Sequence, residues 1–110
     1  MQTTLSQNEA IISSHNANLM RGLEGDGGKL YITNLRLVFE SHSFNIQTGS
    51  TIINIKDITS VDKIWSKFLK IPLFPNGLRI AVSNENFDFV VTGRSAIIDT
   101  LNRTRRQLQG

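Results

Sequence analysis

The apolar residues between Lys29 and Ser41 alternate with polar ones in two short runs that meet at Asn34. Alternation with a period of two is typical of a β-strand with one buried face. Asparagine tolerates a positive φ, so Thr33-Asn34 predicts a tight reversal between two strands. The segment therefore predicts a β-hairpin. Its buried face is expected to hold Leu30, Ile32, Leu35, Leu37 and Phe39.

Similar short runs occur before and after this hairpin. Residues 18–25 form a plausible strand, which the glycine-rich stretch from Glu24 to Lys29 ends as a turn. A second turn signal is Pro75-Asn76-Gly77, after which Leu78, Ile80 and Val82 alternate with more polar neighbours. Further strands are expected at residues 51–58, 58–65, 78–84 and 87–91.

The period changes to that of a helix after residue 93. One face of the predicted helix is mostly apolar, and Thr92 or Ser95 can cap its start. This face is expected to hold Ile97, Leu101, Thr104 and Leu108. About seven short strands followed by one helix predict a mainly β protein. We expect a seven-stranded antiparallel sandwich or partly open barrel, capped by a C-terminal α-helix at residues 94–108.

Composition places the chain among globular proteins. Its 110 residues, 39% hydrophobic and 19% charged, suit a single domain over residues 1–110, with residues 1–15 as a lead-in segment. Cysteine is absent, which excludes disulfides and thiolate metal sites. The sequence has neither a signal-peptide pattern nor the roughly 18 consecutive apolar residues of a spanning helix. We therefore expect a cytoplasmic protein.

Positive charge is concentrated in the second half of the chain. Residues 1–55 hold three bases and four acids, and residues 56–110 hold nine bases and five acids. One basic cluster, from Arg103 to Arg106, suits the C-terminal end of the predicted helix. It has no interleaved aromatic residues, so we do not expect nucleic acid as a partner. The other cluster consists of Lys63, Lys67 and Lys70.

No pattern in the sequence predicts catalysis. His15 and His42 are far apart and lack the spacing of metal ligands, and His42 is expected to make a structural hydrogen bond. The glycines from Gly25 to Gly28 lack the spacing of a phosphate-binding loop, so a turn that needs positive φ is the better interpretation. We expect no enzyme activity, no catalytic or metal-binding residues and no cofactor.

The segment from Lys63 to Phe74 is the best candidate for a functional site. Its large apolar side chains outnumber those that a short loop normally exposes, and its three lysines would form one stripe in a helical turn. Lysines attract anionic lipid headgroups, and tryptophan favours the membrane interface. The candidate lipid- or partner-binding residues are Lys63, Trp65, Lys67, Phe68, Leu69, Lys70 and Phe74.

Three interpretations of this segment are open. The loop can fold back and bury its apolar side chains under the sheet, it can contact a membrane, or it can bind another protein or a second copy of the chain. Our leading hypothesis is a non-catalytic module that associates peripherally with anionic membrane lipid. The alternative is a module that uses the same residues to bind another protein or to associate with copies of itself as a homo-oligomer.

Several short motifs occur in a fixed order along most of the chain. They include Gly22-Leu23-Glu24-Gly25, Gly27 to Tyr31, Thr33-Asn34 with Arg36-Leu37, Asn45-Ile46-Gln47 and Pro75 to Leu78. These motifs resemble those of the GRAM domain, a relative of the pleckstrin-homology fold, and a copy of this length is similar to the short, free-standing microbial examples. The resemblance implies seven strands in two near-orthogonal sheets capped by a C-terminal helix, and a lipid- or protein-binding role.

One feature departs from inositide-binding relatives in the pleckstrin-homology superfamily. Those proteins place several bases around the first hairpin, where they pair with ring phosphates. The corresponding turn here offers Lys29 beside Glu24 and Asp26. The resemblance therefore does not imply an inositide site in the usual place.

Overall fold

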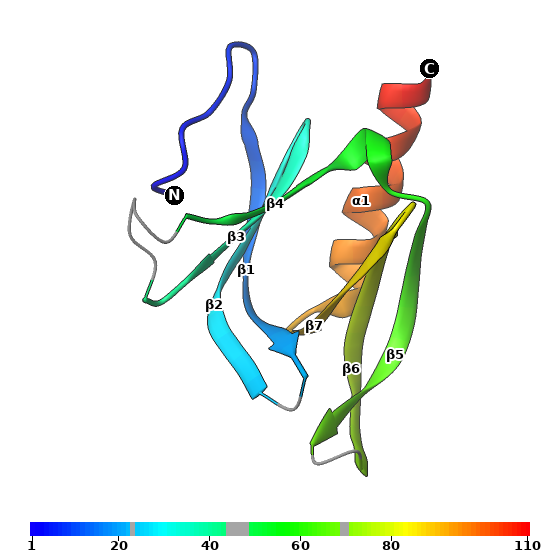
Figure 1. Ribbon diagram of the computed structural model, residues 1–110. Coiled ribbons are helices and arrows are strands. Elements are labelled where there is room, and N and C mark those ends of the chain that lie inside the picture. Colours follow the sequence, from blue (N-terminus) through cyan, green and yellow to red (C-terminus); the bar gives the residue numbers. More distant parts are fainter. Residues whose placement is uncertain (23, 44–48, 69–70) are drawn as a thin grey trace.

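The computed structural model describes residues 1–22, 24–43, 49–68 and 71–110, with side chains for all of these except 66–68 and 71–75. Within this part of the chain, seven strands form one antiparallel sheet and an α-helix follows them (Figure 1). The predicted fold class is confirmed. The elements are β1 (Ile11–Arg21), β2 (Glu24–Thr33), β3 (Arg36–Ser41), β4 (Thr51–Asn54), the 3-10 helix η1 (Ile55–Asp57), β5 (Ser60–Phe68), β6 (Ile71–Val82), β7 (Glu85–Val91) and α1 (Arg94–Gln109).

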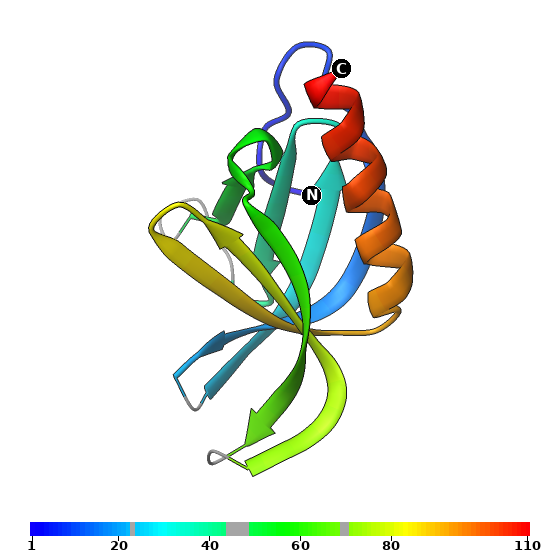
Figure 2. The same ribbon diagram turned by 90° about the vertical axis from the view of Figure 1, so that its right-hand side faces the viewer.

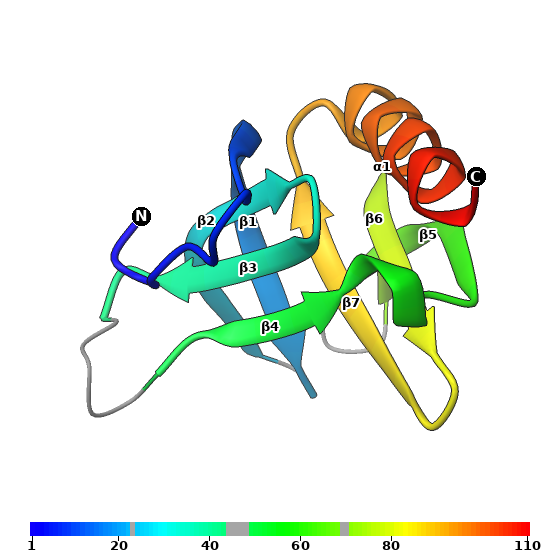
Figure 3. The same cartoon turned by 90° about the horizontal axis from the view of Figure 1, so that it is seen from above.

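The sheet curves around an apolar core. Its strand order is β4-β3-β2-β1-β7-β6-β5, so β4 and β5 are the two outer strands. Helix α1 packs beside η1 and β6, at the opening of the curved sheet (Figures 2 and 3). The rings of Phe39 and Phe89 join the two halves of the sheet, with centroids 5.8 Å apart. Other fully buried side chains include Leu30, Ile32, Leu37, Leu78, Ile80, Ile97 and Leu101.

The β2–β3 hairpin confirms the strongest sequence prediction, although its turn is built differently. Asn34 does not adopt a positive φ. The hydroxyl oxygen of Thr33 instead accepts hydrogen bonds from the backbone N–H groups of Leu35 and Arg36, at 3.0 and 2.8 Å. Leu35 consequently lies half-buried in the turn and outside both strands.

The predicted boundaries of the first two strands are wrong. β1 begins at Ile11, inside the expected lead-in, because Ile11 pairs with Thr33 and the polar residues from Ser13 onward also pair with β2. The turn follows Arg21 and includes Gly22, which has a φ of 65°. The single strand expected at residues 18–25 therefore includes the end of β1, this turn and the start of β2. The glycines from Gly25 to Gly28 lie within β2 and not in a turn.

Close approach of two backbones explains one of these glycines. A Cβ atom at Gly28 would overlap the carbonyl oxygen of Glu40 on β3. We expect Gly28→Ala to lower the free energy of unfolding by about 1–3 kcal/mol, because the two strands must move apart. Gly25→Ala is the matched control, since a Cβ there meets neighbours at an ordinary 3.5 Å. Urea denaturation measures both variants, and equal stability of the two would contradict the explanation.

Three further boundaries differ from expectation. The strand predicted at residues 51–58 ends at Asn54, because η1 turns the chain and the N–H of Ile55 donates to the carbonyl of Leu35. β5 then begins at Ser60. Pro75-Asn76-Gly77, predicted as a turn, lies inside β6, at a place where the β5–β6 register shifts.

Helix α1 confirms the predicted C-terminal helix and extends to Gln109. Ile97, Leu101 and Thr104 are buried as expected, but Leu108 is 41% exposed because the helix extends past the core. Neither Thr92 nor Ser95 caps the start. The N-cap residue is Gly93, with a φ of 74° and no side-chain hydrogen bond.

A buried ion pair fixes the N-terminal segment to the β2–β3 turn. Both carboxylate oxygens of Glu9 accept hydrogen bonds from Arg36, each at 2.8 Å, and one also accepts from the hydroxyl of Thr33. The Glu9 side chain is fully buried and that of Arg36 is 15% exposed. The hydrogen bonds from Arg36, assisted by Thr33 and Ser6, lower the pKa of Glu9 to about 2 despite its burial.

A second buried acid holds the first residues of the chain. The carboxylate of Glu40 on β3 accepts hydrogen bonds from the backbone N–H groups of Gln2 and Thr3 and from the Thr3 hydroxyl. Burial raises the pKa of Glu40, but these hydrogen bonds outweigh it and leave the pKa below its usual value. Residues 2–9 are therefore attached to the sheet at two points.

Candidate functional site

The candidate segment forms the β5–β6 hairpin, which extends away from the core at the end opposite η1 (Figures 1 and 2). The helical-turn interpretation of its lysines is wrong for Lys63 and Lys67, because both lie in β5 and pair with β6. Leu69 and Lys70 lie outside the residues that the structure describes. The side chains of Lys67, Phe68 and Phe74, and with them the predicted burial or exposure of the segment, also lie outside that description.

Lys63 and Trp65 are the two candidate residues whose side chains are described. Both are exposed, and Trp65 has 56% of its surface accessible, the largest value among the exposed large hydrophobic residues described. They are two positions apart on β5: Lys63 pairs with Leu78 on β6, and Trp65 lies where the β5–β6 register shifts. The structure thus places an exposed tryptophan beside an exposed lysine on a projecting hairpin.

Arg94 anchors the base of this hairpin to helix α1. One nitrogen of its guanidinium donates to the carbonyl oxygens of Ile64 on β5 and Gly77 on β6, at 3.1 Å each. A Cβ at Gly77 would lie 2.7 Å from the carbonyl oxygen of Ile64, so glycine permits the close approach of the two strands. The sequence offered Arg94 only as a position that resembles the family and did not predict this anchoring role, because its partners are 30 and 17 residues away.

The turn of the first hairpin has few free bases. Arg21 lies 3.7 Å from the carboxylate of Asp26, and both side chains are exposed. Lys29 and Glu24 are also exposed, in β2. One lysine and one paired arginine against two acids do not make the cluster of cations that binds inositol phosphates. In the structure, as in the sequence, this turn lacks the cluster of bases that inositide-binding relatives have.

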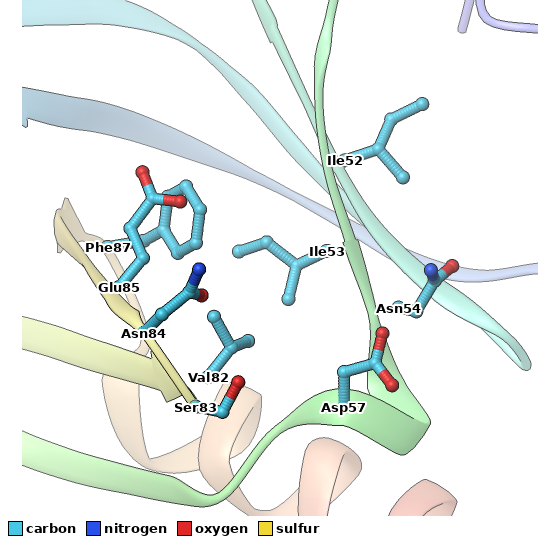
Figure 4. Close-up of a pocket in the computed structure, with 9 residues that line it drawn as sticks. All are labelled: Ile52, Ile53, Asn54, Asp57, Val82, Ser83, Asn84, Glu85 and Phe87. Atoms are coloured by element: carbon cyan, nitrogen blue, oxygen red, sulfur yellow. The ribbon is translucent and has the colours of Figure 1, made fainter.

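A groove that the sequence did not reveal lies between β4 and the β6–β7 turn (Figure 4). Its volume is about 370 Å³, within the range of small ligand sites. Ile53, Val82 and Phe87 form its apolar floor, and Asn84, Asp57 and Glu85 lie around it. The groove was missed because its two walls are about 30 residues apart in the chain and neither has a recognisable motif.

No group of three or more His, Asp or Glu residues that could hold a metal ion occurs within the described ranges. No helix in the part of the chain that the structure describes is long and apolar enough to cross a membrane. The backbone N–H of His42 donates to the carbonyl of Gly27 at 2.8 Å, as part of the turn after β3.

The fold defines a pleckstrin-homology-like domain. The Vps36 N-terminal PH domain superposes with a TM-score of 0.70 at 14% identity, covering 96% of this chain and 86% of that one. The C-terminal domain of an unknown protein from Leishmania infantum superposes with a TM-score of 0.71 at 22% identity, covering 90% and 86%. At these identities the similarity shows the fold alone.

The GRAM domain family matches residues 1–106, and the chain belongs to this family. The resemblance of the sequence motifs to the GRAM domain is thus confirmed. No curated protein matches the chain in sequence. GRAM and pleckstrin-homology-like domains are generally modules for membrane or protein interaction and are typically non-catalytic.

Proposed function

We propose that residues 1–110 act as one non-catalytic binding module, which associates peripherally with anionic membrane lipid through the β5–β6 hairpin. The single observation that carries the proposal is the exposed Trp65 beside the exposed Lys63 on a hairpin that projects from the core (Figure 1). The proposed lipid-binding residues are Lys63, Trp65, Lys67, Phe68, Leu69, Lys70 and Phe74.

The chemistry of these residues supports contact with a bilayer surface. An indole ring at the headgroup level is partly apolar and partly hydrogen-bonding, which favours the membrane interface. Each lysine near an anionic surface contributes about 1 kcal/mol of attraction. A projecting hairpin can reach the headgroups while the rest of the domain stays in water. The proposed location is the cytoplasmic surface of a membrane, without insertion of a spanning segment.

The proposal predicts a charge-dependent change in tryptophan fluorescence. Trp65 is the one tryptophan of the chain, so its emission reports directly on the hairpin. We expect a shift to shorter wavelength with vesicles that contain phosphatidylserine, and no shift with phosphatidylcholine alone. Lys67→Glu/Lys70→Glu should weaken binding by about 30-fold or more, which corresponds to the loss of two lysine attractions.

A variant with the same change in charge controls for net charge. Lys56→Glu/Arg103→Glu replaces two exposed bases on η1 and α1, at the end of the molecule opposite the hairpin. This control should bind nearly as well as the unmodified protein. Absence of binding to anionic vesicles at low salt would refute the proposal. Light scattering tests the alternative, because concentration-dependent dimers that Trp65→Ala abolishes would favour self-association through the same hairpin.

A further inference from the structure

The groove of Figure 4 extends along the whole outer edge of β4. The depression drawn in that figure is lined by Ile52, Ile53 and Asn54 of β4. A second depression, of about 340 Å³, is lined by Thr51 of the same strand, and Glu85 and Phe87 line both depressions. The four residues of β4 therefore form one wall throughout, over roughly 13 Å. The opposite wall is the beginning of β7. An elongated groove of this kind suits an extended chain better than a compact ligand.

β4 is a short outer strand of four residues, but its edge has no lysine, proline or bulge. One edge of β4 pairs with β3 in regular register. β4 is the last strand of the sheet on this side, so among the described residues no strand pairs with its other edge. Natural edge strands are commonly protected by lysine, proline or a bulge. The sequence of β4, Thr51-Ile52-Ile53-Asn54, has no charged residue and no proline. We therefore consider this edge, which has no strand partner within the described ranges, as the place where a further strand can pair.

The side chains beside this edge select the chemistry of such a strand. Ile53 is 4% exposed and points into the groove toward Val82 and Phe87, whereas Ile52 is 45% exposed on the other face of β4 (Figure 4). Asp57 and Glu85 are both exposed and lie on either side of Ile53. The one base lining the groove among the described residues is Arg21, beside Asp26 at the far end.

We infer that this groove binds an extended peptide segment, which adds to β4 as an eighth strand and has the pattern basic–x–apolar–x–basic. Residues two positions apart in a strand face the same side, so the apolar side chain contacts Ile53, Val82 and Phe87. The basic side chains on either side then lie near Asp57 and Glu85. Backbone hydrogen bonds to β4 supply the rest of the interaction. The groove and the β5–β6 hairpin are separate surfaces, so this inference is independent of lipid binding.

The test uses the full chain labelled with ¹⁵N and the probe peptide acetyl-Lys-Thr-Val-Thr-Lys-amide, without vesicles. Titration is expected to move the amide signals of Thr51–Asn54 and Glu85–Phe87. The peptide with glutamate in place of both lysines should bind at least about tenfold more weakly. Absence of shifts at millimolar probe, or shifts confined to other strands, would overturn the inference.

Two further comparisons separate strand addition from simple charge attraction. Methylating the backbone nitrogens of alternate residues gives two versions of the probe, and only the version whose methyl groups face β4 should lose binding. Equal binding of both versions would exclude an added strand. On the protein side, Asp57→Lys/Glu85→Lys should weaken binding by about tenfold, whereas Glu24→Lys/Asp99→Lys, exposed acids outside the groove, should not.

Discussion

Arg36→Ala is expected to lower the free energy of unfolding by about 3–5 kcal/mol. The substitution leaves the fully buried carboxylate of Glu9 without the two hydrogen bonds that Arg36 donates. A buried charge that loses its partner bears the full cost of desolvation, whereas an exposed charge is solvated by water. Arg36 also donates to the carbonyl of Thr4 at 2.9 Å, so the N-terminal segment loses a further contact.

Arg79→Ala is the matched control for this experiment. Arg79 makes the same two-pronged contact with Asp88, at 2.7 and 2.9 Å, but these side chains are 42% and 30% exposed. Loss of a pair that water can solvate should cost about 1 kcal/mol or less. Urea denaturation monitored by far-ultraviolet circular dichroism measures both variants. Equal losses in the two would show that burial of Glu9 is not what makes its ion pair important.

A double replacement separates the buried charge from the shape of the side chains. Glu9→Gln/Arg36→Met removes both charges while it keeps side chains of similar length. We expect it to be more stable than Arg36→Ala, because no unpaired ion is left inside the protein. If the double variant were the less stable of the two, the explanation in terms of an unpaired buried charge would be wrong.

Acid is expected to destabilise the protein over a window set by Glu9. Its pKa is about 2 in the folded protein, below the ordinary value of 4.5. The ionised carboxylate therefore stabilises the folded state fully above about pH 4.5, and this contribution is lost as the pH falls toward 2. The difference corresponds to on the order of 3 kcal/mol. Glu40 contributes in the same direction, because its pKa is also lowered.

Denaturation in urea at a series of pH values between 2 and 7 measures this effect. The part of the unfolding free energy that Glu9 supplies should be nearly constant above pH 5 and should fall steadily below it. Glu9→Gln should start lower at neutral pH and lose less stability in acid, since it has no proton to bind at that position. An equally steep fall in Glu9→Gln would assign the acid sensitivity to other carboxylates.

Local patterns in the sequence were sufficient for the elements whose side chains alternate or repeat regularly. The β2–β3 hairpin and helix α1 were predicted correctly because apolar periodicity records which face of each element is buried. The first half of β1 has no such pattern. Ser13 to Asn16 are polar on both faces, and backbone pairing with β2 makes them a strand. Periodicity cannot detect a strand that is held by hydrogen bonds alone.

Glycine and proline were read as turn signals in places where tertiary contacts gave them another role. Gly28 lies against the backbone of Glu40, and Gly77 lies against that of Ile64. A glycine needed for close approach and a glycine needed for positive φ look identical in a sequence. The contact partner distinguishes them, and it is supplied by another strand.

The sequence by itself determined the fold class, the GRAM family and the unusual apolar and basic composition of the β5–β6 hairpin, because each is recorded in neighbouring residues. Only the tertiary structure decided how Glu9 meets Arg36, how Arg94 joins both strands of that hairpin and where β4 faces the β6–β7 turn. The hydrogen-bonded residues in these arrangements are between 17 and 30 positions apart in the chain. Chain folding creates such contacts between distant segments, and no local pattern encodes them.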